Sequence, residues 1–153
     1  CVKHMMKKLD IERIGLAAMS LGIARACLDH SLKYSQEREQ FGQSIINFQA
    51  VSEKIANMYI GYRVARSFVY EASQIIDHGS RANQEAAAAK VFASEMATKV
   101  SLDAIQVMGG YGYIREFPVE RLMRDAKLLE IGGGTSEILR GVVIKEFLRK
   151  SGK

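Results

Sequence analysis

The chain of 153 residues contains no Trp, one Pro and two Cys. Cys1 and Cys27 form neither a disulfide framework nor a CxxC motif, and Cys27, in an Ala-rich stretch, is expected to be a small core residue. With Pro118 as the only proline, little interrupts long helices. No apolar run reaches membrane-spanning length and no signal peptide is visible, so we expect no membrane span.

Metal-ligand spacing is also missing, because His4, His30 and His78 stand alone in the sequence. We therefore expect no metal site. The net charge of +5 and the pI near 9.3 are compatible with a polyanionic partner. The positive residues are scattered singly, apart from Lys7-Lys8 and 145–153, and no aromatic residues are interleaved with them. A solvated basic surface is the preferred interpretation, and strongly salt-dependent binding would instead indicate a nucleic-acid partner.

Apolar residues recur at helical spacing and predict helices over about 10–35, 48–77, 83–108, 119–126 and 135–148. Asp10 and Thr135 are predicted N-caps, and Gly79 is expected to end the second helix. No segment shows the two-residue period of a strand, and 36–43 is a polar connector. The predicted fold class is all-α, an antiparallel four-helix bundle in a single domain over 1–153, with the Ala-rich third helix at its centre.

Two glycine-rich segments, 109–112 and 132–134, let a backbone approach a ligand closely because no Cβ intervenes. The helix after Thr135 would offer unpaired amides to an anion. A turn followed by a helix cap explains the same residues, and both interpretations stay open. Arg38 can pair with a pyrophosphate through its planar fork, although a solvated arginine is the more common case.

In combination, four segments resemble the C-terminal domain of the acyl-CoA dehydrogenase family across nearly the whole chain. They are Arg38-Glu39-Gln40-Phe41-Gly42 with Phe48-Gln49, 106–113, Arg124-Asp125-Ala126-Lys127, and Gly134-Thr135-Ser136-Glu137-Ile138. The resemblance implies the helical C-terminal part of a longer flavoenzyme. Its N-terminal helical domain and middle β domain would be missing here, and the chain starts with Cys1 rather than Met. Alone, it is expected to be inactive.

The resemblance also implies FAD and a homotetramer in which neighbouring chains share each FAD. The implied FAD-binding residues are Arg38, Gln40, Phe41, Gln49, Gln106, Val107, Met108, Gly109, Gly110, Thr135, Ser136 and Glu137. The implied acyl-CoA-binding residues are Asp10, Ile11, Arg13, Leu16, Gly132, Gly133 and Gly134. The implied electron acceptor is electron-transfer flavoprotein, in the mitochondrial matrix of a eukaryote or the cytoplasm of a bacterium.

One position departs from most of the family, which carries the catalytic glutamate directly before a Gly-Thr pair. That position is Gly133 here, which cannot take a proton. Leu9-Asp10-Ile11-Glu12-Arg13 resembles the stretch in which isovaleryl-CoA dehydrogenases carry their base instead. Glu12 is thus the predicted base that removes the α-proton of an acyl-CoA. A first-turn glutamate that complements the helix dipole is the alternative.

The same departure bears on the substrate. Gly132 stands where relatives for straight medium chains often have a bulky Tyr, and Leu16 lies one turn after Glu12 on the same face. A short branched acyl group such as isovaleryl is therefore expected. Long-chain dehydrogenases also place their base on this helix, so a longer acyl group is the alternative substrate. A non-catalytic helical oligomerisation bundle is the alternative without chemistry.

Overall fold

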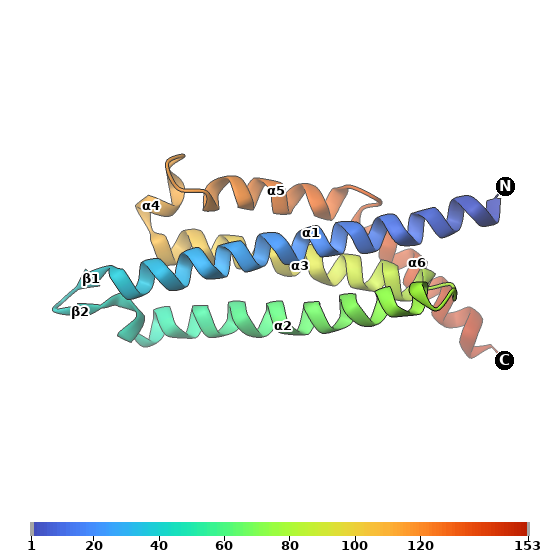
Figure 1. Cartoon of the computed structure of the whole chain (residues 1–153), viewed down its shortest axis with the longest axis horizontal. Helices are drawn as coiled ribbons and strands as arrows, with labels where there is room; N and C mark the ends of the chain where they lie inside the picture. The colour runs from blue at the N-terminus through green and yellow to red at the C-terminus, as the bar shows by residue number, and fades with distance from the viewer. Residues whose placement is uncertain (1, 153) are drawn as a thin grey trace.

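The computed structural model describes residues 2–152, so Cys1 and Lys153 lie outside it. Four helices run side by side in alternating directions: α1 (Val2–Glu37), α2 (Gln49–Asp77), α3 (Asn83–Met108) and α5 (Val119–Ile131) (Figure 1). The last helix, α6 (Ser136–Ser151), packs on α3 at the end of the bundle where α1 begins (Figure 1). The predicted all-α antiparallel bundle is confirmed.

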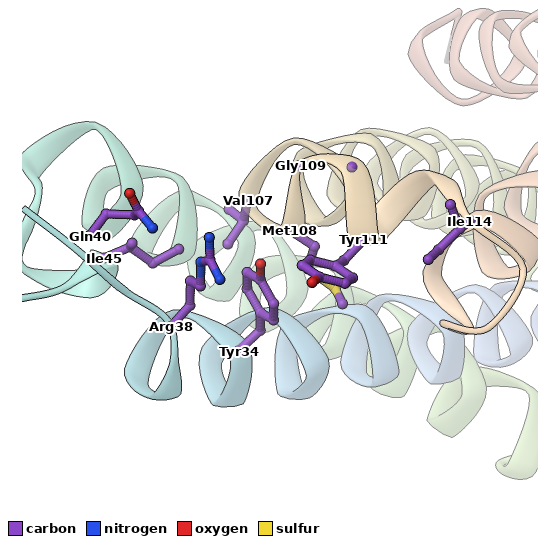
Figure 2. A pocket seen from close by; sticks show the side chains of 10 residues that line it. Tyr34, Arg38, Gln40, Ile45, Val107, Met108, Gly109, Tyr111 and Ile114 are labelled. Atoms are coloured by element: carbon purple, nitrogen blue, oxygen red, sulfur yellow. The ribbon is translucent and has the colours of Figure 1, made fainter.

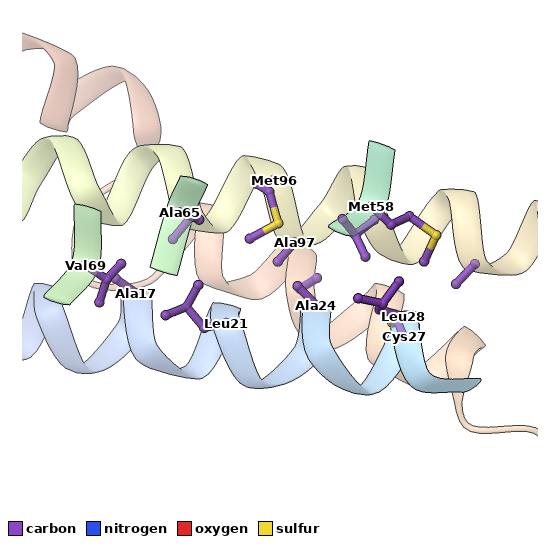
Figure 3. Close-up of a cluster of buried hydrophobic side chains, with 14 of the residues drawn as sticks. Ala17, Leu21, Ala24, Cys27, Leu28, Met58, Ala65, Val69, Met96 and Ala97 are labelled. Atoms are coloured by element: carbon purple, nitrogen blue, oxygen red, sulfur yellow. The ribbon is translucent and has the colours of Figure 1, made fainter. Parts of the chain in front are cut away.

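Helix α3 lies at the centre and contacts α1, α2, α5 and α6. Its fully buried positions include a series of alanines: Ala86, Ala87, Ala93, Ala97 and Ala104. Small side chains let helix axes approach closely, and larger residues such as Leu21, Met58 and Val69 fill the space between them (Figure 3). Cys27 belongs to this core, as expected, and burial raises the pKa of its thiol to about 12.

The predicted start of the first helix was wrong. Helix α1 begins at Val2, so Asp10 lies inside it and is not its N-cap. The residues before Asp10 include Met and Lys, which favour helix, and no breaker separates them from it. Helix α5 is also longer than predicted and continues past Ala126 to Ile131. The N-cap role of Thr135 is confirmed, because its hydroxyl accepts a hydrogen bond from the Ile138 amide.

The connector after α1 contains a small hairpin that the sequence did not predict. Strands β1 (Glu39–Gln40) and β2 (Gln43–Ser44) pair antiparallel, and a 3-10 turn η1 (Ile45–Asn47) leads into α2. Phe41 and Gly42 both have positive φ, as a tight hairpin turn requires. After α3, Gly109 reverses the chain with φ 58°, and a single-turn helix α4 (Gly110–Tyr113) follows.

Within residues 2–152, no helix is both long and apolar enough to cross a membrane. The described part of the chain also holds no cluster of three or more His, Cys, Asp or Glu side chains suited to a metal ion.

Candidate active site

Glu12, Leu16 and Gly133 meet where α1 passes the turn between α5 and α6. A Cβ atom built on Gly133 would lie 3.9 Å from Oε1 of Glu12 and would overlap Cδ1 of Leu16. The side chain of Glu12 is otherwise exposed. A carboxylate on α1 therefore reaches the place from which a side chain at position 133 would start.

Two glycines of this turn have backbone conformations that other residues avoid. Gly133 has φ 65° and Gly134 has φ 105°, whereas Gly132 has an ordinary φ of −64°. A glutamate at position 133 would meet both this strained conformation and the side chain of Leu16. The turn and Leu16 together disfavour a side chain at position 133, and Glu12 supplies a carboxylate beside it.

The first residues of α6 continue the site. Ser136 is 4% exposed, and its buried hydroxyl finds no hydrogen-bond partner within the described residues. The pKa of Glu137 is lowered because its carboxylate accepts hydrogen bonds from its own backbone amide and from the Thr135 hydroxyl. A helix start with an unpaired buried hydroxyl suits a ligand with hydrogen-bonding groups.

Asp10 and Arg13 flank Glu12 but point into the bundle. Asp10 is 2% exposed and lies 3.6 Å from Nη1 of Arg13. Arg13 donates a hydrogen bond of 2.8 Å to Asn83, which in turn donates one of 3.0 Å to Glu146. The four side chains tie α1 to the start of α3 and to α6. Their roles in acyl-CoA binding remain predictions, since both Asp10 and Arg13 are buried by this network.

Lys90 is a residue of this site that the sequence did not reveal. It is fully buried on α3, and its ammonium group donates to the backbone carbonyls of Glu130, at 3.2 Å, and Gly134, at 2.8 Å. Desolvation lowers the pKa of Lys90. The one signal in the sequence was a single Lys inside the otherwise apolar run from Ala86 to Ala93.

A second candidate site lies at the opposite end of α1. A groove of about 500 Å³ opens between the end of α1, the hairpin and the start of α4 (Figure 2). It brings together six of the residues expected at FAD: Arg38, Gln40, Val107, Met108, Gly109 and Gly110. Tyr34 and Tyr111 also line it, with ring centroids 6.1 Å apart, and neither was predicted.

The other expected residues lie outside these two sites. Phe41 stands 91% exposed at the hairpin tip, with only an edge-to-face contact to Phe48 at 6.1 Å. Gln49, Gln106 and Ile11 are exposed on their helices and line neither the groove nor the Glu12 cluster.

The Glu12 cluster and the groove at Arg38 are far apart along α1. Arg38 follows Glu12 by 26 residues, which at ~1.5 Å per residue is roughly 39 Å along α1. The two sites therefore lie at opposite ends of the bundle (Figure 1).

The chain matches the family model "Acyl-CoA dehydrogenase, C-terminal domain" over residues 2–148, and it belongs to this family. It is 50% identical over 96% of its length to the probable acyl-CoA dehydrogenase YngJ of Bacillus subtilis. It is 47% identical over 95% of its length to the mitochondrial isovaleryl-CoA dehydrogenase of Oryza sativa subsp. japonica.

Among solved structures, the chain is similar to one described as the electron transferring flavoprotein of Acidaminococcus fermentans. The TM-score is 0.94 and the identity 46%, over 96% of this chain and 39% of that chain. The chain also spans only 39% of the length of YngJ and 36% of that of the rice enzyme.

The buried Asp10 gives a prediction about pH. Burial raises its pKa above the ordinary 3.8, although Arg13 lowers it. The folded chain thus keeps this proton where the unfolded chain has lost it, and the free energy of unfolding falls as pH rises from 3.8 to the folded pKa. Asp10→Asn has no proton to lose.

The melting temperature of Asp10→Asn minus that of wild type should therefore rise as pH increases across this interval, and then level off. Thermal unfolding between about pH 3.5 and about pH 7 measures the difference. Asp29→Asn, at an exposed position of the same helix, is the matched control. A difference that is constant or moves the other way would contradict the assignment.

Proposed function

We propose that the chain is the C-terminal domain of an FAD-dependent acyl-CoA dehydrogenase in which Glu12 is the catalytic base. The single observation that carries the proposal is the approach of the Glu12 carboxylate to Gly133, where the family usually has its glutamate. Membership of the family supports the activity. The N-terminal helical domain and the middle β domain belong to the same proposal, since the relatives are more than twice as long.

In this mechanism Glu12 removes the α-proton of the acyl thioester and holds it on its carboxylate. A positioned general base of this kind contributes ~10²–10⁴-fold to the rate. FAD, when bound, supplies the acceptor for the β-hydride. The turn at 132–134 presents backbone in place of side chains, so the acyl group can lie close to Glu12.

The described residues fit FAD at two places. The start of α6 offers the buried, unpaired Ser136 hydroxyl. At the other end, Arg38 offers a planar cation for a pyrophosphate in a groove walled by Gly109 and Gly110. The exposed Phe41 at the hairpin tip would be covered in such a complex.

The separation of the two places supports an oligomer. Roughly 39 Å along α1 exceeds the diameter of a small domain, and one dinucleotide does not bridge it. We therefore infer that each FAD meets the start of α6 in one chain and Arg38 in a neighbouring chain. A closed assembly such as the proposed homotetramer provides this arrangement.

For the substrate, we favour a short branched acyl-CoA such as isovaleryl-CoA. The absence of side chains at 132–134 widens the space beside Glu12, and Leu16 occupies part of it. The similarity to an isovaleryl-CoA dehydrogenase supports this choice. Electron-transfer flavoprotein is the proposed acceptor, in the mitochondrial matrix or the bacterial cytoplasm, in line with relatives from both settings.

A panel of acyl-CoA substrates tests the activity. The full-length protein, purified with its flavin, is mixed with isovaleryl-CoA, butyryl-CoA or palmitoyl-CoA and an excess of an electron-accepting dye, and bleaching of the dye is followed. Isovaleryl-CoA should give the highest kcat/KM. A preference for palmitoyl-CoA would favour the long-chain alternative. No bleaching with any acyl-CoA would favour a non-catalytic bundle.

The shared site gives a prediction about mixed assemblies. Glu12→Gln removes the base of one site, and Arg38→Ala removes a cation that serves the neighbouring chain's site. When both variants are co-expressed in one full-length assembly, some sites should combine an intact Glu12 with an intact Arg38. Activity should then reappear at FAD concentrations that leave Arg38→Ala alone nearly empty.

Arg25→Ala is the control for that experiment, because Arg25 is an exposed residue of α1 that pairs with Asp29 on the same helix. When Glu12→Gln is co-expressed with Arg25→Ala instead, activity should be proportional to the fraction of chains that keep Glu12. Absence of any recovery in the Arg38→Ala mixture would mean that Glu12 and Arg38 serve one site in the same chain.

A further inference from the structure

Lys90 is an unusual residue for the centre of a helical bundle. It lies in the Ala-rich stretch of α3, has 0% of its surface exposed, and both of its hydrogen-bond acceptors are backbone carbonyls. Burying an ammonium group costs free energy unless new interactions offset the lost hydration. Desolvation accordingly lowers the pKa of Lys90. An apolar side chain such as Met would fill similar space without this cost.

The two carbonyls show what the ammonium group does. Glu130 is the next-to-last residue of α5, where carbonyls have no partner within the helix and the helix dipole is negative. Gly134 ends the glycine turn, directly before the Thr135 cap of α6. With contacts of 3.2 Å and 2.8 Å, Lys90 links the two ends of the five-residue segment 130–134.

That segment contains the wall of the Glu12 site. Gly133 lies within it, facing Leu16 and Glu12, and its conformation is one that few residues adopt. Glycine has the largest conformational freedom of any residue, so a turn of three glycines does not hold one geometry by itself. A fixed donor outside the turn restricts it at both ends.

We propose that Lys90 is a positioning residue, which holds the 130–134 turn against Glu12 and Leu16 and so aligns the acyl group with the base. This inference rests on the proposed function. Lys90 touches neither the acyl group nor the reacting atoms in this role. It acts through the carbonyls of Glu130 and Gly134. Its loss should therefore affect the chemical step more than the binding of acyl-CoA.

Two substitutions in the full-length protein test the proposal. Lys90→Met removes the donor and keeps the length of the side chain, whereas Lys90→Arg keeps a cation with several donors. Lys99→Met is the matched control, because Lys99 lies on the same helix but is exposed. Met58→Ala is the control for lost stability, because Met58 is a fully buried core residue outside the Lys90 contacts.

Hydrogen exchange gives a readout that does not depend on activity. In Lys90→Met, amides in peptides covering 130–136 should exchange at least about tenfold faster, while other α3 and α5 peptides stay protected. In the dye-coupled dehydrogenase assay, kcat should fall by about 10- to 100-fold with KM changed much less, as expected for a small misplacement of reacting groups. Lys90→Arg should recover part of both effects.

The results of these experiments decide whether Lys90 positions the turn. Normal exchange in the turn or an unchanged kcat in Lys90→Met would overturn the proposal, as would a fall in kcat no larger than that of Met58→Ala at equal loss of melting temperature. If neither Lys90 variant yields folded, flavin-loaded protein, Lys90 serves the fold as a whole and the proposal is again wrong. A wild-type protein inactive toward every acyl-CoA would instead refute the proposed function, and exchange alone would then test the turn.

Discussion

The turn at Gly133 packs against Leu16, and much of the candidate active site follows from that contact, since a side chain at position 133 would need Leu16 to move and would strain the backbone. The backbone of Gly133 has positive φ, and Cδ1 of Leu16 fills the place of a Cβ. The same contact brings Glu12, one helical turn before Leu16, to the edge of the space that a side chain at 133 would occupy. With glycine at 133, the carboxylate beside this turn comes from α1.

The length of α1 sets the distance between the two candidate sites. One helix carries Glu12 near one end and is followed by Arg38 at the other, so a single rigid element sets the distance between two candidate binding regions. Helix α3 makes this possible, because its alanines let α1 and α5 approach until the turn meets Leu16. The buried Lys90 interrupts those alanines at the level of the turn, where it contacts both ends of the glycine segment.

Much of the fold could be predicted from local patterns in the sequence. Helical periodicity and glycine placement gave the bounds of α3 and the cap at Thr135, since those signals act within one or two turns. The start of α1 was missed because Asp10, a good N-cap residue, is buried by packing against Arg13 instead. The two-residue strands around Phe41 are too short for any period to show.

For the site, residue identity pointed to Glu12 and Gly133, but only the tertiary structure shows that they meet. Lys90 and Asn83 could not be assigned from the sequence, because their partners are distant along the chain. The partners of Lys90 lie 40 and 44 positions away, and Arg13 lies 70 positions from Asn83. Such contacts depend on how helices are packed, which no local pattern encodes.

The base assignment is tested most directly by exchange of the substrate's α-proton with deuterated solvent, measured for the full-length protein carrying Glu12→Gln. The amide keeps the size of the side chain but cannot accept the proton, so exchange should fall by at least ~10²–10⁴-fold, while FAD and acyl-CoA binding persist. Glu37→Gln, at the exposed far end of the same helix, should behave as wild type. Near-normal exchange in Glu12→Gln would remove Glu12 from the mechanism.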